Sequence, residues 1–160
     1  MKKFYIMVGL SEIGKSTYVK THYNKPNYLI IETDAIREEL CGNASDQSKN
    51  SEVFETARNR FRTWLSTPNS EQDNCIIDAT NLTFKERENW YNIIQDEYQM
   101  EIGVDIFITL IMFENNIEKA LLQNNKRERC VPDYVIKKHS AKLEDPILWE
   151  QYNCAIIEVK

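Results

Sequence analysis

Five short apolar runs alternate along the chain with longer segments in which apolar residues recur every three or four positions. The runs are rich in isoleucine, valine and aromatic residues, as is typical of strands that are buried on both faces. They lie at residues 4–9, 28–32, 74–78, 104–113 and 154–159. The helical segments lie at residues 15–23, 35–41, 51–66, 84–99, 116–125 and 132–143. This alternation predicts an α/β fold with a central parallel five-stranded sheet and helices on both of its faces.

The composition is that of an ordinary globular protein, with 42% hydrophobic and 28% charged residues in 160. We expect one domain over residues 1–160, because the chain contains no linker and no internal repeat. The polar segment at residues 42–50 is predicted to be a mobile loop. A net charge of −5 argues against a protein that coats nucleic acid, although it allows one that grips a single end of a strand.

The cysteines and the apolar runs indicate where the protein works. Four widely separated cysteines form no CxxC pair, and only His22 and His139 accompany them, so no zinc-ligand spacing is present. Reduced thiols in the cytoplasm are the simplest interpretation, in the host cytoplasm if the chain is phage-encoded. No apolar stretch approaches the roughly 20 residues of a membrane helix, so no membrane partner is expected.

The clearest chemical signal is the pattern G-x-x-x-x-G-K-[ST], which runs from Gly9 to Ser16 between a predicted strand and a predicted helix. In such a phosphate-binding loop, glycines let backbone N–H groups surround an anion at a helix N-terminus. Lys15 is expected to reach the β- and γ-phosphates of ATP, and the Ser16 hydroxyl to bind Mg²⁺. The residues expected to contact ATP are Gly9, Leu10, Ser11, Glu12, Ile13, Gly14, Lys15, Ser16 and Thr17.

Glu12 is unusual within this loop, because a carboxylate beside a triphosphate is repulsive. One interpretation is that its side chain points to solvent while its backbone still serves the loop. The other is that Glu12 weakens ATP binding. The first is favoured.

Polar residues follow the second and third predicted strands, where the carboxyl ends of parallel strands line the ligand crevice of an open sheet. Asp34 is a candidate general base for an attacking hydroxyl, and Arg37, one helical turn later, a candidate ligand for an acceptor phosphate. Asp78 suits a Mg²⁺-associated carboxylate, with Thr80 and Asn81 in the next loop placed to bind substrate. For both aspartates, simple helix capping is the alternative.

A basic segment lies between the last two predicted helices. Residues 115–142 hold seven Lys and Arg against three acids, and Arg127 and Arg129 belong to this excess. Such a run is usually a solvated loop. Beside a phosphate-binding loop, however, arginines on a mobile lid neutralise charge on a transferred phosphoryl group. We therefore predict a helical lid at about residues 123–132.

The motifs GxxxxGKS, TDxxR, IIDATNLT and KRxRxVP, in this order from residue 4 to about residue 143, resemble the phage-type polynucleotide 5′-hydroxyl kinases within the P-loop kinases. The resemblance implies a parallel-sheet kinase that transfers the γ-phosphate of ATP, with Mg²⁺, to a 5′-hydroxyl end of DNA or RNA. It also implies a role for each matching residue: Lys15 and Ser16 at the phosphates and Mg²⁺, Asp34 as base, Arg37 on the acceptor's 3′-phosphate, Thr80 and Asn81 on the substrate side, and Arg127 or Arg129 on the lid.

The chain departs from that family in three ways. Residues 11–13 replace a proline and small residues, and Leu122 and Gln123 stand where a further lid arginine is common. No phosphatase or ligase domain accompanies the kinase motifs, which predicts a kinase that works with separate enzymes of those kinds. Two alternatives stay open: a kinase for a sugar, nucleoside or antibiotic-like alcohol, which the acidic composition favours, and a non-catalytic nucleotide-binding module.

Overall fold

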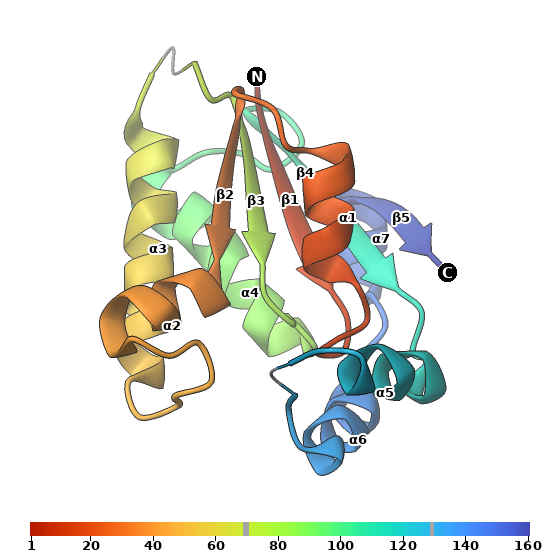
Figure 1. The fold of residues 1–160 in the computed structure, drawn as a ribbon. Helices are drawn as coiled ribbons and strands as arrows, with labels where there is room; N and C mark the ends of the chain where they lie inside the picture. Colours follow the sequence, from red (N-terminus) through yellow and green to blue (C-terminus); the bar gives the residue numbers. More distant parts are fainter. Residues whose placement is uncertain (69–70, 129) are drawn as a thin grey trace.

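The computed structural model describes residues 1–68, 71–128 and 130–160 (Figure 1). Its centre is a five-stranded sheet in which every neighbouring pair of strands is parallel, in the order β2-β3-β1-β4-β5. The strands are β1 (Lys2–Val8), β2 (Tyr28–Glu32), β3 (Asn74–Asp78), β4 (Ile106–Phe113) and β5 (Ala155–Val159). The predicted fold class is therefore confirmed, because five apolar runs joined by helices could satisfy their backbone groups in one parallel sheet. The edge strand β5 is not buried on both faces as predicted, since Ile156 and Ile157 are partly exposed.

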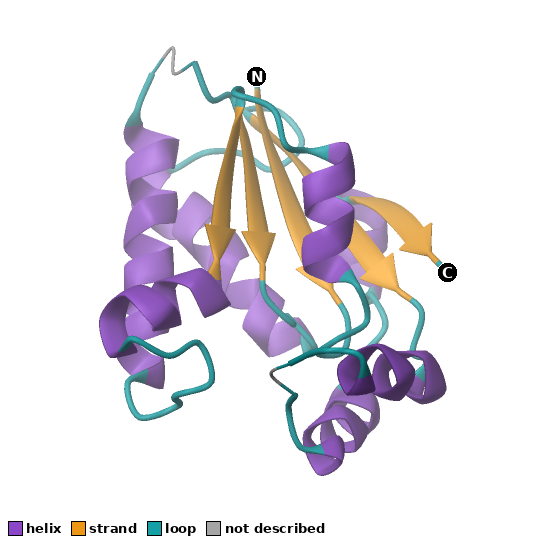
Figure 2. Ribbon diagram, viewed as in Figure 1, coloured by secondary structure: helices purple, strands orange, loops and turns teal. Residues whose placement is uncertain are grey.

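Helices cover both faces of this sheet (Figure 2). Helix α1 (Lys15–His22) packs on one face, and α3 (Asn50–Ser66), α4 (Phe84–Asn92) and α7 (Leu148–Asn153) pack on the other. Three further helices lie at the carboxyl ends of the strands: α2 (Thr33–Cys41), α5 (Ile117–Asn125) and α6 (Asp133–Lys142). Across the described ranges, no helix is long and apolar enough to cross a membrane.

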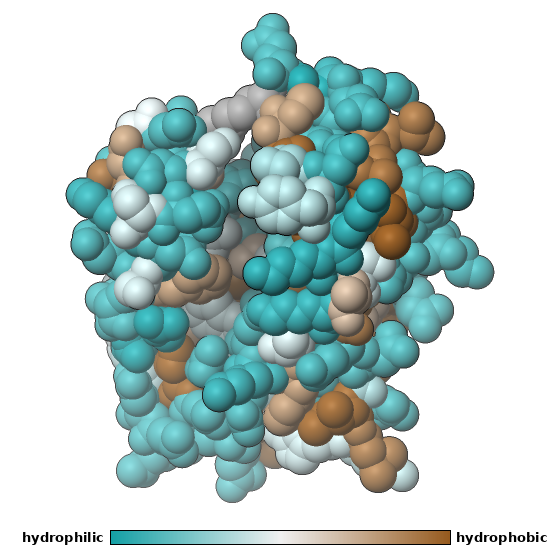
Figure 3. All heavy atoms as spheres, turned by 90° about the horizontal axis from the view of Figure 1, so that it is seen from below, coloured by the Kyte–Doolittle hydropathy of each residue, from teal (hydrophilic) through white to brown (hydrophobic). Residues whose placement is uncertain are grey.

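The edge of the sheet at which the strands end is mostly hydrophilic (Figure 3). Seen from this edge, the surface is hollowed between the part of the molecule that contains α2 and the part that contains α5 and α6. Any residue that directly follows a strand is thereby brought to one crevice.

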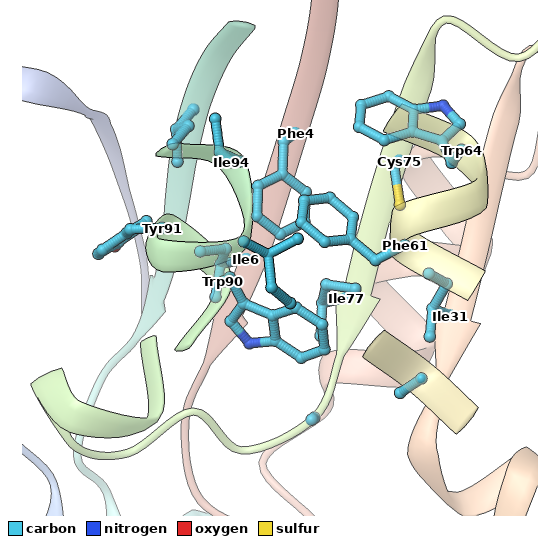
Figure 4. Close-up of a cluster of buried hydrophobic side chains, with 14 of the residues drawn as sticks. Phe4, Ile6, Ile31, Phe61, Trp64, Cys75, Ile77, Trp90, Tyr91 and Ile94 are labelled. Carbon is cyan, nitrogen blue, oxygen red and sulfur yellow. The ribbon is translucent and has the colours of Figure 1, made fainter. Parts of the chain in front are cut away.

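Two apolar layers hold the helices to the sheet, because successive side chains of a strand point to opposite faces. Phe4 and Ile6 of β1 point toward Phe61 of α3 and Trp90 of α4 (Figure 4). The rings of Phe4 and Phe61 stack with their centroids 4.3 Å apart. Met7 points the other way, into the layer below α1.

Two helical features were not predicted. The periodic segment at residues 84–99 continues as a π-helical turn at Ile93–Glu97, where Ile93 and Ile94 are both buried. Helix α7 was not predicted because it has only six residues and no apolar stripe. Two of its large apolar side chains, Leu148 and Tyr152, are exposed. It is held instead by the buried carboxylate of Glu150.

Glu150 pairs with Arg87 of α4, and both side chains are fully buried. Arg87 Nε and Nη2 donate to the two carboxylate oxygens at 2.8 and 3.0 Å, and the Tyr91 hydroxyl donates to the same carboxylate at 2.6 Å. Arg87 Nη1 donates to the carbonyl oxygens of Asn81 and Leu82. Burial and the adjacent carboxylate raise the pKa of Tyr91 well above its ordinary value. The pair thus joins α4, α7 and the loop that follows β3.

We expect Arg87→Met to lower the free energy of unfolding by about 3–5 kcal/mol, because it leaves the carboxylate of Glu150 buried without its cation. Replacing both partners, as in Arg87→Met with Glu150→Leu, should recover much of the loss. Urea titration measures the difference. The matched control is Arg58→Met, whose ion pair with Glu55 is exposed and should cost about 1 kcal/mol or less. Equal losses for the two single variants would contradict the assignment.

Candidate functional site

The loop between β1 and α1 has the conformation of a phosphate-binding loop. A Cβ atom at Gly9 would lie 2.9 Å from Cβ of Phe113, so only glycine fits where β1 passes β4. Gly14 has a φ of 109°, which a residue with a side chain rarely adopts. The Gly9 N–H donates to the carbonyl oxygen of Thr80 at 3.0 Å, which ties the loop to the segment after β3.

Lys15 is the buried cation of this loop. Its Nζ donates to the carbonyl oxygens of Gly9 at 3.1 Å and Leu10 at 2.5 Å. Burial lowers the pKa of Lys15 to about 8, while the carboxylates of Asp78, Asp34 and Glu12 act in the opposite direction. The ammonium group is therefore still charged at pH 7 and is held ready for an anion.

Ser16 and Asp78 meet at the start of α1. The serine hydroxyl donates to Asp78 Oδ2 at 2.7 Å. Burial raises the pKa of Asp78, against the opposing effects of Ser16 and Lys15. Asp78 is the last residue of β3, and α4 is capped by Thr83 instead, so the capping alternative for Asp78 is wrong.

These groups fit ATP with Mg²⁺. The loop presents a helix N-terminus and a buried ammonium for phosphate, and the hydroxyl and carboxylate of Ser16 and Asp78 are the oxygen ligands that Mg²⁺ prefers. Within the described part of the chain, no three His, Cys, Asp or Glu residues cluster as a complete metal site. A Mg²⁺ ion held by one or two protein oxygens together with phosphates and water needs no such cluster.

Asp34 lies in the first turn of α2, directly after β2, with its carboxylate 66% exposed. The N-cap position of α2 is Glu32, and no side chain caps this helix, so the capping alternative for Asp34 is wrong. Arg37 Nη1 donates to Asp34 Oδ1 at 2.7 Å, and Nη2 donates to Asn50 Oδ1 at 2.9 Å. The side chain of Arg37 is only 7% exposed, and its Nε has no hydrogen-bond partner among the described residues.

Glu32 adds a third carboxylate to this edge. Its pKa is raised by burial and by the neighbouring charges of Asp78 and Asp34. Lys20 and Arg127 act on the pKa of Glu32 in the opposite direction. The crevice is therefore anionic apart from a few placed cations.

Glu12 does not point to solvent, so the favoured interpretation from the sequence is wrong. Its side chain is 10% exposed and forms an ion pair with Arg127 Nη1. Arg127 is also close enough to Asp34 for the two charges to interact. The structure thus brings Arg127 of the predicted lid to the phosphate-binding loop, whereas Arg129 lies outside the described residues.

The structure separates Asn81 from the crevice and so corrects its predicted role in substrate binding. Asn81 is buried, its Nδ2 donates to the carbonyl oxygen of Met7 at 2.9 Å, and its Oδ1 accepts from Trp90 Nε1 at 3.1 Å. The two ends of the amide thus fix the loop to β1 and to α4. Thr80 contributes its backbone carbonyl to Gly9, and its side chain stays a candidate for substrate contact.

His139 of α6 was missed, because no motif marks it in the sequence. Its Nδ1 accepts the N–H of Ser11 at 3.4 Å, which requires a neutral ring. Burial lowers the pKa of His139, and Lys15, Lys142 and Lys138 add to the effect, against Glu86. The only hint in the sequence was its position on the helix that follows the basic segment.

The chain has relatives among known families and folds. A family model described as an AAA domain matches residues 4–146. No curated protein sequence matches the chain.

Several solved structures share the fold. A chain of the Pnkp1/Rnl/Hen1 RNA repair complex has a TM-score of 0.68 at 20% identity, over 95% of this chain and 45% of that one. A fungal RNA kinase has a TM-score of 0.65 at 14% identity, over 99% and 74%. A gluconokinase from Sinorhizobium meliloti 1021 has a TM-score of 0.59 at 13% identity, over 98% and 82%. The chain thus has a P-loop kinase fold and spans less than half of the repair-complex chain.

We expect His139 to make stability depend on pH. Because its pKa in the folded protein is below the ordinary 6.5, the unfolded chain binds the proton more readily between these two values. The free energy of unfolding should therefore fall as the pH is lowered through 6.5 toward the folded pKa. Urea titrations between about pH 5.5 and 7.5 should show that His139→Gln removes this slope. His22→Gln, on the exposed side of α1, is the matched control, and an unchanged slope in His139→Gln would refute the assignment.

Proposed function

Because this chain belongs to the AAA domain family and has a P-loop kinase fold, we propose that it transfers the γ-phosphate of ATP to the 5′-hydroxyl end of DNA or RNA. Separate phosphatase or ligase enzymes would prepare or use the same ends.

Phosphoryl transfer is supported by the residues that surround one crevice. ATP with Mg²⁺ would supply the phosphoryl group and neutralise part of its charge. Lys15 and the loop N–H groups would bind and orient the phosphates, and Ser16 and Asp78 would hold the metal ion. Asp34 is exposed at the strand end, where its carboxylate can accept the proton of an attacking hydroxyl.

A phosphate-bearing acceptor is supported by one observation. Arg37 Nε is a buried donor without a partner among the described residues, and a buried unsatisfied N–H is unfavourable. A phosphate oxygen next to the reacting hydroxyl would satisfy this N–H, while Nη1 keeps Asp34 in place. A nucleic-acid end carries such a phosphate on the 3′ side of the nucleotide that bears the 5′-hydroxyl, whereas a simple sugar does not.

A small-alcohol kinase is the second candidate, and the charges of the crevice favour it. Glu32, Asp34 and Asp78 lie along the same edge, and Arg37 is already engaged by Asp34 and Asn50. Such an edge is better suited to a neutral acceptor than to a polyanion. The fold that this chain shares with a gluconokinase supports a small alcohol as the second candidate acceptor.

We expect the protein to label a 5′-hydroxyl oligonucleotide with radioactive phosphate from γ-labelled ATP in the presence of Mg²⁺. Lys15→Ala should reduce labelling below detection, because it removes the buried cation at the phosphates. An oligonucleotide that already carries a 5′-phosphate is the control substrate. Labelling of gluconate or another sugar, with none of the oligonucleotide, would replace this proposal with the second candidate.

We expect Asp34→Asn to lower the turnover number by about 10²-fold or more while ATP affinity changes little, because the amide cannot accept the proton of the acceptor. Steady-state kinetics and calorimetric titration with ATP measure the two quantities separately. Asp96→Asn, an exposed carboxylate on the π-helical turn, is the matched control. Full turnover in Asp34→Asn would show that this residue is not the base.

A further inference from the structure

Glu12 stands at the fourth position of the phosphate-binding loop with a φ of 66°. This left-handed conformation favours glycine and is disfavoured for a residue with a Cβ atom. The loop nevertheless keeps a long carboxylate there, and it buries that carboxylate to 10% exposure. A residue held in a disfavoured backbone conformation, with its carboxylate buried beside an anion site, points to a functional role for that carboxylate.

The ion-pair partner of Glu12 is Arg127, which lies just after the end of α5. Arg127 is 57% exposed, so the cation is the accessible member of the pair and the carboxylate is the enclosed one. The bond to Glu12 raises the pKa of Arg127, and the charge of Asp34 adds to this effect. The guanidinium therefore contacts the loop through Glu12, and its charge also acts on Asp34.

We propose that Glu12 is a specificity-determining residue that competes with the γ-phosphate of the nucleotide for Arg127. This inference rests on ATP binding at the loop, as proposed above. Without nucleotide, the carboxylate takes the place of a phosphate as the ligand of Arg127. A nucleotide with a γ-phosphate draws Arg127 away from Glu12, whereas a diphosphate leaves the pair intact.

Glu12 and the γ-phosphate compete for Arg127 because few cations are available to the Glu12 carboxylate. Lys15 is a second cation that acts on the loop, and its ammonium already donates to two loop carbonyl oxygens. When Arg127 turns to a phosphate, Glu12 is left enclosed without its ion-pair partner. ATP therefore binds more weakly than the loop geometry alone would allow, and the penalty falls on ATP more than on ADP.

The test is a double-mutant cycle in which affinities for Mg²⁺ with ATP or ADP are measured by calorimetry, without acceptor. Glu12→Gln keeps the shape of the side chain and removes its charge, and should tighten ATP binding by about tenfold and ADP binding by about threefold or less. In an Arg127→Gln background, the same change should alter ATP affinity by less than about twofold. Glu128→Gln, an exposed carboxylate next to Arg127 in the chain, is the matched control and should leave ATP affinity unchanged.

Three results would overturn the proposal. An equal gain in both backgrounds would mean that Glu12 simply repels phosphate. Weaker ATP binding in Glu12→Gln would mean that the pair holds Arg127 in its productive position, and unchanged affinity would mean that the pair has no effect on the nucleotide. If the wild-type protein binds no ATP at all, the proposed function itself fails, which is a separate outcome. Glu12→Gly, which suits the φ of 66°, repeats the test if Glu12→Gln does not fold.

Discussion

The parallel arrangement of the five strands is the constraint on which the rest of this structure depends. Because all strands run the same way, every strand ends at one edge, and the residues that follow them converge there. With β1 between β3 and β4, the phosphate-binding loop lies beside Asp78 and within reach of the segment after α5. Asp34 arrives at the same edge from β2. The order and direction of the strands therefore determine which chain segments line the crevice.

Charge is the second organising factor of the site. Glu12, Asp34 and Asp78 are brought together on a protein whose net charge is already negative. Such an edge is stable only because cations are placed within it, Lys15 below the loop and Arg127 above it. A polyphosphate ligand would have to share these cations with carboxylates. The affinity of this site for a polyphosphate would therefore depend on how easily Lys15 and Arg127 exchange their present partners for phosphate oxygens.

Much of the polar segment after β3 serves to support the loop rather than to bind a ligand. Asn81 fixes the segment to Met7 of β1 and to Trp90 of α4. Arg87 holds the carbonyl oxygens of the same segment while it pairs with Glu150. Because the Gly9 N–H donates to the Thr80 carbonyl oxygen in this segment, the buried network behind the sheet sets the position of the phosphate-binding loop. Stability and function are linked through it.

The sequence by itself determined the strands, most helices and the phosphate-binding loop, because apolar periodicity and glycine geometry are local properties. It also placed Asp34 at a strand end. Only the tertiary structure decided what each polar side chain contacts. Asn81 is buried and bonds to Met7, His139 accepts from the N–H of Ser11 in the loop, and Glu12 pairs with Arg127, 115 positions away in the chain. Partners of that kind depend on packing between distant elements, and no local pattern encodes them.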